Sequence, residues 1–234
     1  MKICFIGLDG SGKSTQSDIL LLEMQKRNLD VVYRHQFRYE SDKVMTAKDK
    51  LRPLIKRMQF LMCIPGSVLI KSRPLKIIRD NFLWRLIRPF FVYPIGITVL
   101  ISGLVKARGK NKLYGGHNYF IMDRCFLDEL ARVEWKLEIR IPFKKLWYRL
   151  APAPDITFYF DIPGTKSWER MDPVDTGMEA MTKKENTYKR IIPLYGEFTD
   201  MNVLKTENMN IKEVTELVFE NLNQKIENLN LNSE

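Results

Sequence analysis

The chain has 234 residues, which is enough for one sizeable α/β domain or for a domain that carries a large insertion. Apolar residues make up 45% of the sequence, as is ordinary for a globular protein that buries a core. The net charge of +10 excludes a uniformly basic chain. Residues 43–112 hold 16 Lys and Arg against two acids, whereas the rest of the chain has a net charge of −4.

The cysteine content and the amino terminus predict the compartment. Cys4, Cys63 and Cys125 are far apart and lack metal-ligand spacing, so we expect buried, reduced thiols. The first predicted strand starts at residue 2, which leaves no room for a signal peptide before it. We therefore expect a cytoplasmic protein, with membrane association left open by the basic segment.

The first predicted elements are a strand at residues 2–6, a glycine-rich turn at 7–15 and a helix at 15–27. The turn reads Gly-Leu-Asp-Gly-Ser-Gly-Lys-Ser-Thr and fits the P-loop pattern of a Gly, four residues and Gly-Lys-Ser/Thr. Backbone N–H groups in such a turn, together with the helix N-terminus, hold a polyphosphate. We therefore predict ATP binding, and the expected ATP-binding residues are Gly7, Asp9, Gly10, Ser11, Gly12, Lys13, Ser14 and Thr15.

Residues 43–112 are predicted to form a long helical insertion that is both basic and apolar. Its prolines are expected to break it into short helices. Within the insertion, residues 90–105 contain no charged side chain. A straight helix of this length would span about 24 Å, short of the roughly 30 Å of a bilayer core, so we do not expect a transmembrane span. The prolines expected to break the insertion are Pro53, Pro65, Pro74, Pro89 and Pro94.

Two interpretations of this uncharged run stay open. In the first, it is a buried helix that packs on the sheet or across a homodimer interface. In the second, residues 81–112 contact a membrane surface peripherally, with the apolar run beside a polybasic patch. Nucleic-acid binding is less favoured, because the aromatic residues cluster in the apolar run and do not alternate with the basic ones.

Four more strands are predicted, at residues 30–36, 118–123, 155–162 and 202–206. Short apolar runs that alternate with helical segments, the last at 212–226, are typical of a parallel sheet covered on both faces. We predict an α/β P-loop kinase fold with a five-stranded parallel sheet and helices on both faces. All 234 residues are expected to form one domain, with residues 43–112 inserted into it.

Phosphoryl transfer requires a metal-binding carboxylate and cations near the P-loop, and three residues are candidates for these roles. Lys13 is expected to reach the β- and γ-phosphates, and the Ser14 hydroxyl to bind Mg²⁺. Asp123 and Arg124, at the carboxyl end of strand 118–123, supply a metal-shell carboxylate and a cation. Asp9 either accepts a hydrogen bond from a substrate hydroxyl or serves only to form the turn.

These motifs resemble the thymidylate kinase family. The resemblance rests on the P-loop sequence, on the Asp123-Arg124 pair and on Pro154-Asp155 at the start of a strand. It covers roughly residues 1–40 and 113–230 and leaves the middle unmatched. The chain is most similar to a divergent thymidylate-kinase-like branch with a long, apolar and basic middle segment.

The resemblance implies roles for individual residues. Asp9 would contact the sugar hydroxyl of the acceptor, Asp123 and Arg124 would serve the metal and the acceptor phosphate, and Arg170 would close over the ATP phosphates from a lid. The predicted catalytic residues are thus Lys13, Asp9, Arg124 and Arg170. Acceptor binding is assigned to Asp9 and Arg124, with Arg34, Arg38 and Asp128 as further candidates from stretches that depart from the family pattern.

The sequence therefore predicts an ATP- and Mg²⁺-dependent phosphotransferase that acts on a small phosphate acceptor, most simply a nucleoside monophosphate such as dTMP. One alternative is a P-loop kinase that phosphorylates a sugar or a lipid-linked hydroxyl at a membrane surface. Another is a nucleotide-binding ATPase that is not a kinase. A GTPase is not favoured, because Asn111-Lys112-Leu113-Tyr114 lacks the aspartate of a guanine-binding motif.

Overall fold

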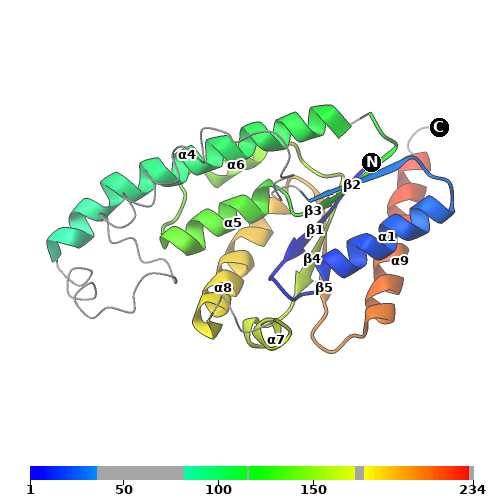
Figure 1. Ribbon diagram of the computed structural model, residues 1–234. Coiled ribbons are helices and arrows are strands. Elements are labelled where there is room, and N and C mark those ends of the chain that lie inside the picture. The colour runs from blue at the N-terminus through cyan, green and yellow to red at the C-terminus, as the bar shows by residue number, and fades with distance from the viewer. Residues whose placement is uncertain (36–81, 115, 172–176, 232–234) are drawn as a thin grey trace, which may run out of the picture.

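The computed structural model describes residues 1–35, 82–114, 116–171 and 177–231, which form a parallel β-sheet between layers of helices (Figure 1). Every strand pairs with its neighbour in parallel, and the strand order is β2-β3-β1-β4-β5. The prediction of a five-stranded parallel sheet is confirmed. The strands are β1 (Lys2–Gly7), β2 (Val31–His35), β3 (Tyr119–Asp123), β4 (Ile156–Asp161) and β5 (Asp200–Lys205).

Helices cover both faces of the sheet, as predicted, and each face has its own apolar core. Successive side chains of a strand point to opposite faces, so Ile3 and Phe5 join one core while Cys4 and Ile6 join the other. Helices α1 (Lys13–Lys26) and α9 (Ile211–Leu231) pack on the first core. Those on the second are α4 (Phe82–Tyr114), α5 (Phe126–Leu137), α6 (Lys144–Leu150) and α8 (Met178–Tyr195), while α7 (Gly164–Glu169) follows β4.

The expected chain breaks at Pro89 and Pro94 are wrong, because both prolines lie inside the continuous 33-residue helix α4. Proline removes one helical hydrogen bond and crowds the preceding turn. Both residues lie on the exposed side of α4, where water can satisfy the carbonyl that loses its partner. The other prolines expected to break the insertion lie outside the described residues.

Helix α4 is amphipathic along the run at residues 90–105. Leu100 and Leu104 are buried in the core shared with α5, whereas Ile101 and Val105 are 50% and 64% exposed. The buried-helix interpretation is therefore correct for one face of α4 only. Of the helices that the structure describes, none is long and apolar enough to cross a membrane.

The packing of α4 on α5 can be tested with two neighbouring residues. Leu100→Ala removes a fully buried side chain and is expected to lower the free energy of unfolding by about 2–5 kcal/mol. Ile101→Ala, on the exposed face of the same helix, is expected to change it by less than about 0.5 kcal/mol. Urea unfolding followed by circular dichroism measures both, and equal effects would contradict the packing described here.

Candidate active site

The glycine-rich turn after β1 has the backbone of a phosphate-binding loop. Gly10 and Gly12 have φ values of +79° and +92°, in the left-handed region that favours glycine. A Cβ atom on Gly10 would lie 2.8 Å from the backbone oxygen of Ser167, so this close approach also requires glycine. Gly12 caps α1, whose first turn contains no acidic residue. The N-terminus of α1 therefore presents N–H groups and a positive dipole end, which suit a phosphate.

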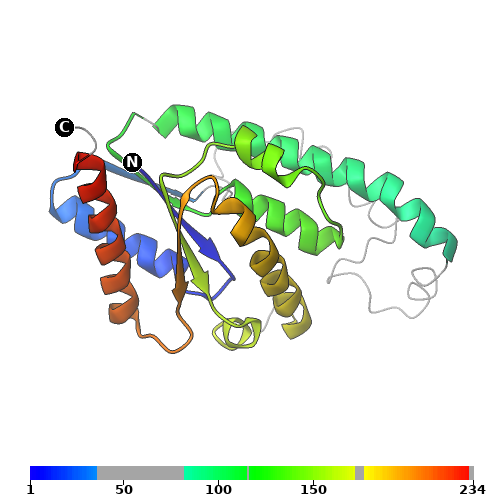
Figure 2. The ribbon, with the colours of Figure 1, turned by 180° about the vertical axis from the view of Figure 1, so that it is seen from behind.

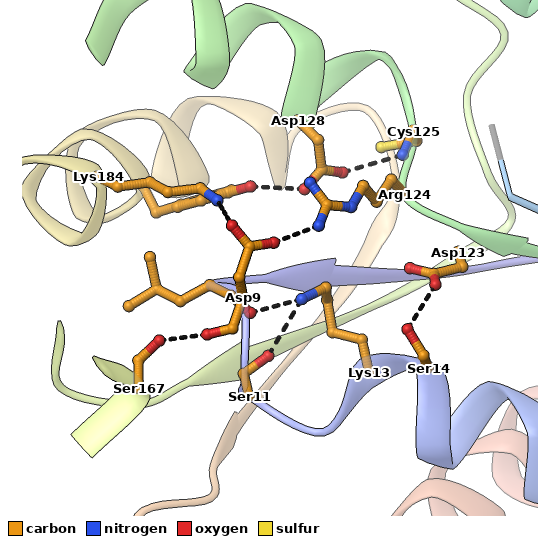
Figure 3. A network of polar contacts seen from close by, with 12 residues as sticks. Asp9, Ser11, Lys13, Ser14, Asp123, Arg124, Cys125, Asp128, Ser167 and Lys184 are labelled. Carbon is orange, nitrogen blue, oxygen red and sulfur yellow. Dashed lines mark hydrogen bonds and ion pairs between the residues drawn. The ribbon is translucent and has the colours of Figure 1, made fainter. Parts of the chain in front are cut away.

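Lys13 lies folded back over this loop. Its side chain is buried, and its ammonium group donates to the backbone oxygen of Leu8 and to Ser11 Oγ at 3.5 Å (Figure 3). Burial lowers the pKa of Lys13 to about 8, and the nearby cations Arg124 and Lys184 lower it further, against the opposing effect of Asp9. A bound polyphosphate would stabilise the protonated form, so the loop is electrostatically suited to an anion.

Ser14 and Asp123 meet although they are far apart in the sequence. Ser14 starts α1 next to the loop, Asp123 ends β3, and the Ser14 hydroxyl donates to Asp123 Oδ2 at 2.7 Å. Both are hard oxygen ligands, as Mg²⁺ prefers, and Mg²⁺ usually keeps several waters and substrate oxygens. No group of three or more His, Cys, Asp and Glu gathers as a metal site among the described residues, which fits such a sparsely coordinated ion. The pair therefore fits the predicted metal role.

Asp9 connects three elements of the site. One of its carboxylate oxygens accepts from Arg124 Nη2, and the other accepts from Lys184 Nζ at 2.5 Å (Figure 3). Burial alone would raise the pKa of Asp9, but the charges of Lys184 and Arg124 hold it well below its usual value. Asp9 is therefore ionised at neutral pH and serves as the counter-ion of two cations.

Arg124 adopts an uncommon backbone conformation for a residue with a side chain. Its φ is +75°, and its backbone N–H donates to the Phe5 oxygen at 3.0 Å. This left-handed residue ends β3 and sends its guanidinium toward Asp9. The strain is localised at the point where the sheet edge meets the P-loop, which is typical of a functional position.

Asp128 supports the site from within α5. Its carboxylate accepts from the backbone N–H of Cys125 at 2.9 Å and from the Tyr188 hydroxyl at 2.5 Å, and the residue is buried. Burial raises its pKa above the usual value, against the lowering effects of Arg124 and these hydrogen bonds. The structure thus places Asp128 as a helix-capping residue close to Arg124. Its predicted contact with the acceptor stays a prediction.

The remaining predicted residues lie apart from this cluster or outside the described chain. Arg170 follows α7 and donates to the backbone oxygen of Glu207 at 3.1 Å, on the loop before α9. Arg34, in β2, has its guanidinium 5.0 Å from the centre of the Tyr114 ring. Arg38 is outside the described residues. The structure thus brings together Asp9, Ser11, Lys13, Ser14, Asp123 and Arg124, with Gly7, Gly10, Gly12 and Thr15 framing the loop.

Lys184 is the residue that sequence reasoning missed. Its side chain is 6% exposed, and it lies between the buried residues Met181 and Tyr188 on the inner face of α8. A lysine at a core position of an amphipathic helix is the signal that could have indicated it. Ser167, at the end of α7, was also missed, and its hydroxyl donates to the backbone oxygen of Asp9.

Comparison with known proteins identifies the fold. No protein-family model matches the chain, and no curated protein matches it by sequence. Solved structures, in contrast, match almost all of it. A deoxyadenosine kinase from M. mycoides with bound dATP has a TM-score of 0.55 at 14% identity, with 95% of this chain and all of that chain covered.

Two further structures agree. The same deoxyadenosine kinase with dCMP as product gives a TM-score of 0.55 at 15% identity over 96% of this chain and 100% of that chain. A thymidylate kinase from Ehrlichia chaffeensis gives 0.52 at 18% identity over 95% and 98%. At these identities the likeness concerns the fold, so the protein has the fold of P-loop nucleoside and nucleotide kinases. The predicted thymidylate-kinase-like fold is confirmed at that level.

The role of Asp9 as counter-ion predicts a loss of stability in the Asp9→Asn variant. The substitution leaves Arg124 and Lys184 facing each other and is expected to lower the free energy of unfolding by about 1–3 kcal/mol. This is less than for a fully buried pair, because 32% of the Asp9 side chain is exposed to screening solvent. Asp18→Asn, on the exposed side of α1, is the control and should change stability by less than about 0.5 kcal/mol.

The pH dependence of the same comparison has a definite sign. The pKa of Asp9 is lower in the folded protein than its ordinary value of 3.8, so its contribution is present above that pH. It is lost as the pH falls through 3.8 toward the folded-state pKa, and the difference between wild type and Asp9→Asn should shrink accordingly. Urea unfolding at several pH values measures this. An Asp9→Asn variant as stable as Asp18→Asn at neutral pH would refute the counter-ion role.

Proposed function

We propose that this protein is an ATP-dependent phosphotransferase whose acceptor is a nucleoside monophosphate. One observation carries the proposal: Lys13, Arg124 and Lys184 surround the single carboxylate of Asp9 beside a phosphate-binding loop. Such an excess of positive charge at low exposure is costly unless an anion binds there. A nucleoside triphosphate and a phosphorylated acceptor together supply that charge.

The loop and its neighbours divide the work on the donor. The N–H groups at the start of α1 would hold the ATP phosphates, and Lys13 would turn from the Leu8 oxygen to their β- and γ-oxygens. Ser14 and Asp123 would hold Mg²⁺. When bound, this ion neutralises charge on the phosphate oxygens. Arg170 is proposed to close over the same phosphates.

The low pKa of Asp9 favours a phosphate acceptor over a hydroxyl acceptor. A general base works best when its pKa lies near the working pH, and the pKa of Asp9 lies far below it. A phosphate monoester loses its second proton with a pKa near 6, so its attacking oxygen is already ionised at neutral pH. Asp9 is then needed only to accept a hydrogen bond from the acceptor sugar, and Arg124 to hold the acceptor phosphate. Arg34, Arg38 and Asp128 are proposed as further acceptor contacts, and dTMP is one candidate.

Lys184 is proposed to stabilise charge on the transferred phosphoryl group. The P-loop contains no arginine, so this charge must come from outside the loop. The ammonium of Lys184 is held at Asp9, within reach of the space between Lys13 and Arg124, by a helix that packs on α5. A rigid element of the scaffold thus presents the cation, and Asp9 keeps it positioned before substrates bind.

Turnover with a panel of acceptors tests the function. We expect Mg-ATP and a nucleoside monophosphate to give ADP release that depends on the acceptor, whereas nucleosides and free sugars give little. Lys13→Ala should abolish the signal, because the β- and γ-phosphates lose their cation. Nucleoside-dependent release would overturn the acceptor assignment, and no acceptor-dependent release with any compound would overturn the kinase.

Two adjacent lysines on α8 allow a matched test of the proposed role of Lys184. Lys184→Met is expected to lower kcat about 10²–10³-fold with little change in KM for ATP, as for loss of one preorganised charge. Lys183→Met is the control, because Lys183 is 48% exposed and pairs with Glu138 and Glu179 at the surface. Lys184→Arg should recover part of kcat. Equal kcat values for the two Met variants would exclude the role.

A further inference from the structure

Exposed apolar side chains gather on one outer surface of the described structure. Six of the twelve large hydrophobic residues that are exposed there belong to α4 or to α6 and its N-terminal cap. The two most exposed are phenylalanines, each 79% accessible. We call this surface the α4–α6 face, and it consists of Phe90, Ile101, Val105, Phe143, Leu146 and Leu150.

The spacing of these residues places each set on one side of its helix. On α4, Phe90, Ile101 and Val105 are separated by eleven and four residues, so they line up opposite Leu100 and Leu104 in the core. On α6, the spacing of three and four residues does the same for Phe143, Leu146 and Leu150. Both helices are therefore amphipathic, with a second apolar stripe that faces outward.

The two stripes belong to one continuous surface. Arg108 Nε on α4 donates to the backbone oxygen of Leu150 at 2.9 Å, and the Tyr93 hydroxyl donates to the backbone oxygen of Arg140 at 3.2 Å. Figures 1 and 2 show from opposite sides that α4 and α6 run next to each other along the outer edge of the molecule, above α5.

The charge of this face has one sign. Helix α4 contains six Lys and Arg and helix α6 contains three, and neither helix contains an Asp or a Glu. Lys112 and Arg149 are exposed, and Lys145 pairs with Glu197 from the neighbouring loop. An apolar stripe flanked by such cations is complementary to a surface that is negatively charged outside and apolar beneath.

We propose that the α4–α6 face docks peripherally on an anionic lipid bilayer. The phenylalanine and aliphatic side chains would enter the headgroup boundary, while the flanking lysines and arginines would contact lipid phosphates. A second copy of the chain fits less well, because a two-fold interface would bring the same positive charges together. A nucleic acid would satisfy the cations but would leave the aliphatic stripe without an apolar partner.

Vesicle flotation of the whole protein tests this proposal independently of any turnover. We expect binding to vesicles of phosphatidylcholine with phosphatidylglycerol at low salt, and little binding to phosphatidylcholine alone. The double variant Phe90→Gln/Phe143→Gln should weaken binding at least about tenfold, because two aromatic side chains no longer leave water. Lys112→Gln/Arg149→Gln should weaken it and reduce its salt dependence.

A matched control separates a specific face from general hydrophobicity. Leu22 is 57% exposed on α1, on the opposite face of the sheet, so Leu22→Gln should leave vesicle binding unchanged. Thermal unfolding should be the same for all four proteins, since the replaced side chains are exposed. No binding to the anionic vesicles would overturn the proposal, as would binding that the phenylalanine variant leaves intact. A wild-type dimer in sedimentation velocity that this variant dissociates would assign the face to a second copy instead.

Discussion

The parallel pairing of β1 with β3 is the constraint on which the site depends. In this register Phe5 lies opposite Asp123, so the two strands end side by side at the same edge of the sheet. The loop after β1 and the Asp123-Arg124 pair after β3 therefore meet, although more than 100 residues separate them. Because parallel strands cannot be joined by a tight turn, the long middle segment can lie between them without disturbing this contact.

Electrostatics then determine what this edge of the sheet can bind. One carboxylate, Asp9, is shared by Arg124 and Lys184, and the buried ammonium of Lys13 lies close by. Each cation is partly removed from water and only partly compensated, so the empty site favours an incoming anion. The same arrangement keeps Asp9 ionised, which makes it a hydrogen-bond acceptor and a poor proton acceptor.

The middle of the chain shows where sequence patterns mislead. Helix breaking by Pro89 and Pro94 was a sound local expectation, yet a long helix that packs its inner face on α5 tolerates both prolines on its outer side. The outer face keeps an apolar stripe and an acid-free set of basic residues. The uncharged run at residues 90–105 thus has two different faces, which a one-dimensional count of apolar residues does not separate.

The sequence alone determined the P-loop, the five strands, their parallel class and the residues that end β1 and β3. These features are local, since each depends on the order of glycines, apolar runs and charges within a few residues. Only the tertiary structure decided that Lys184 joins Asp9, that Asp128 caps α5 and that Arg170 lies at the loop before α9. Those contacts join segments distant in sequence, and helix packing, which no short pattern encodes, brings them together.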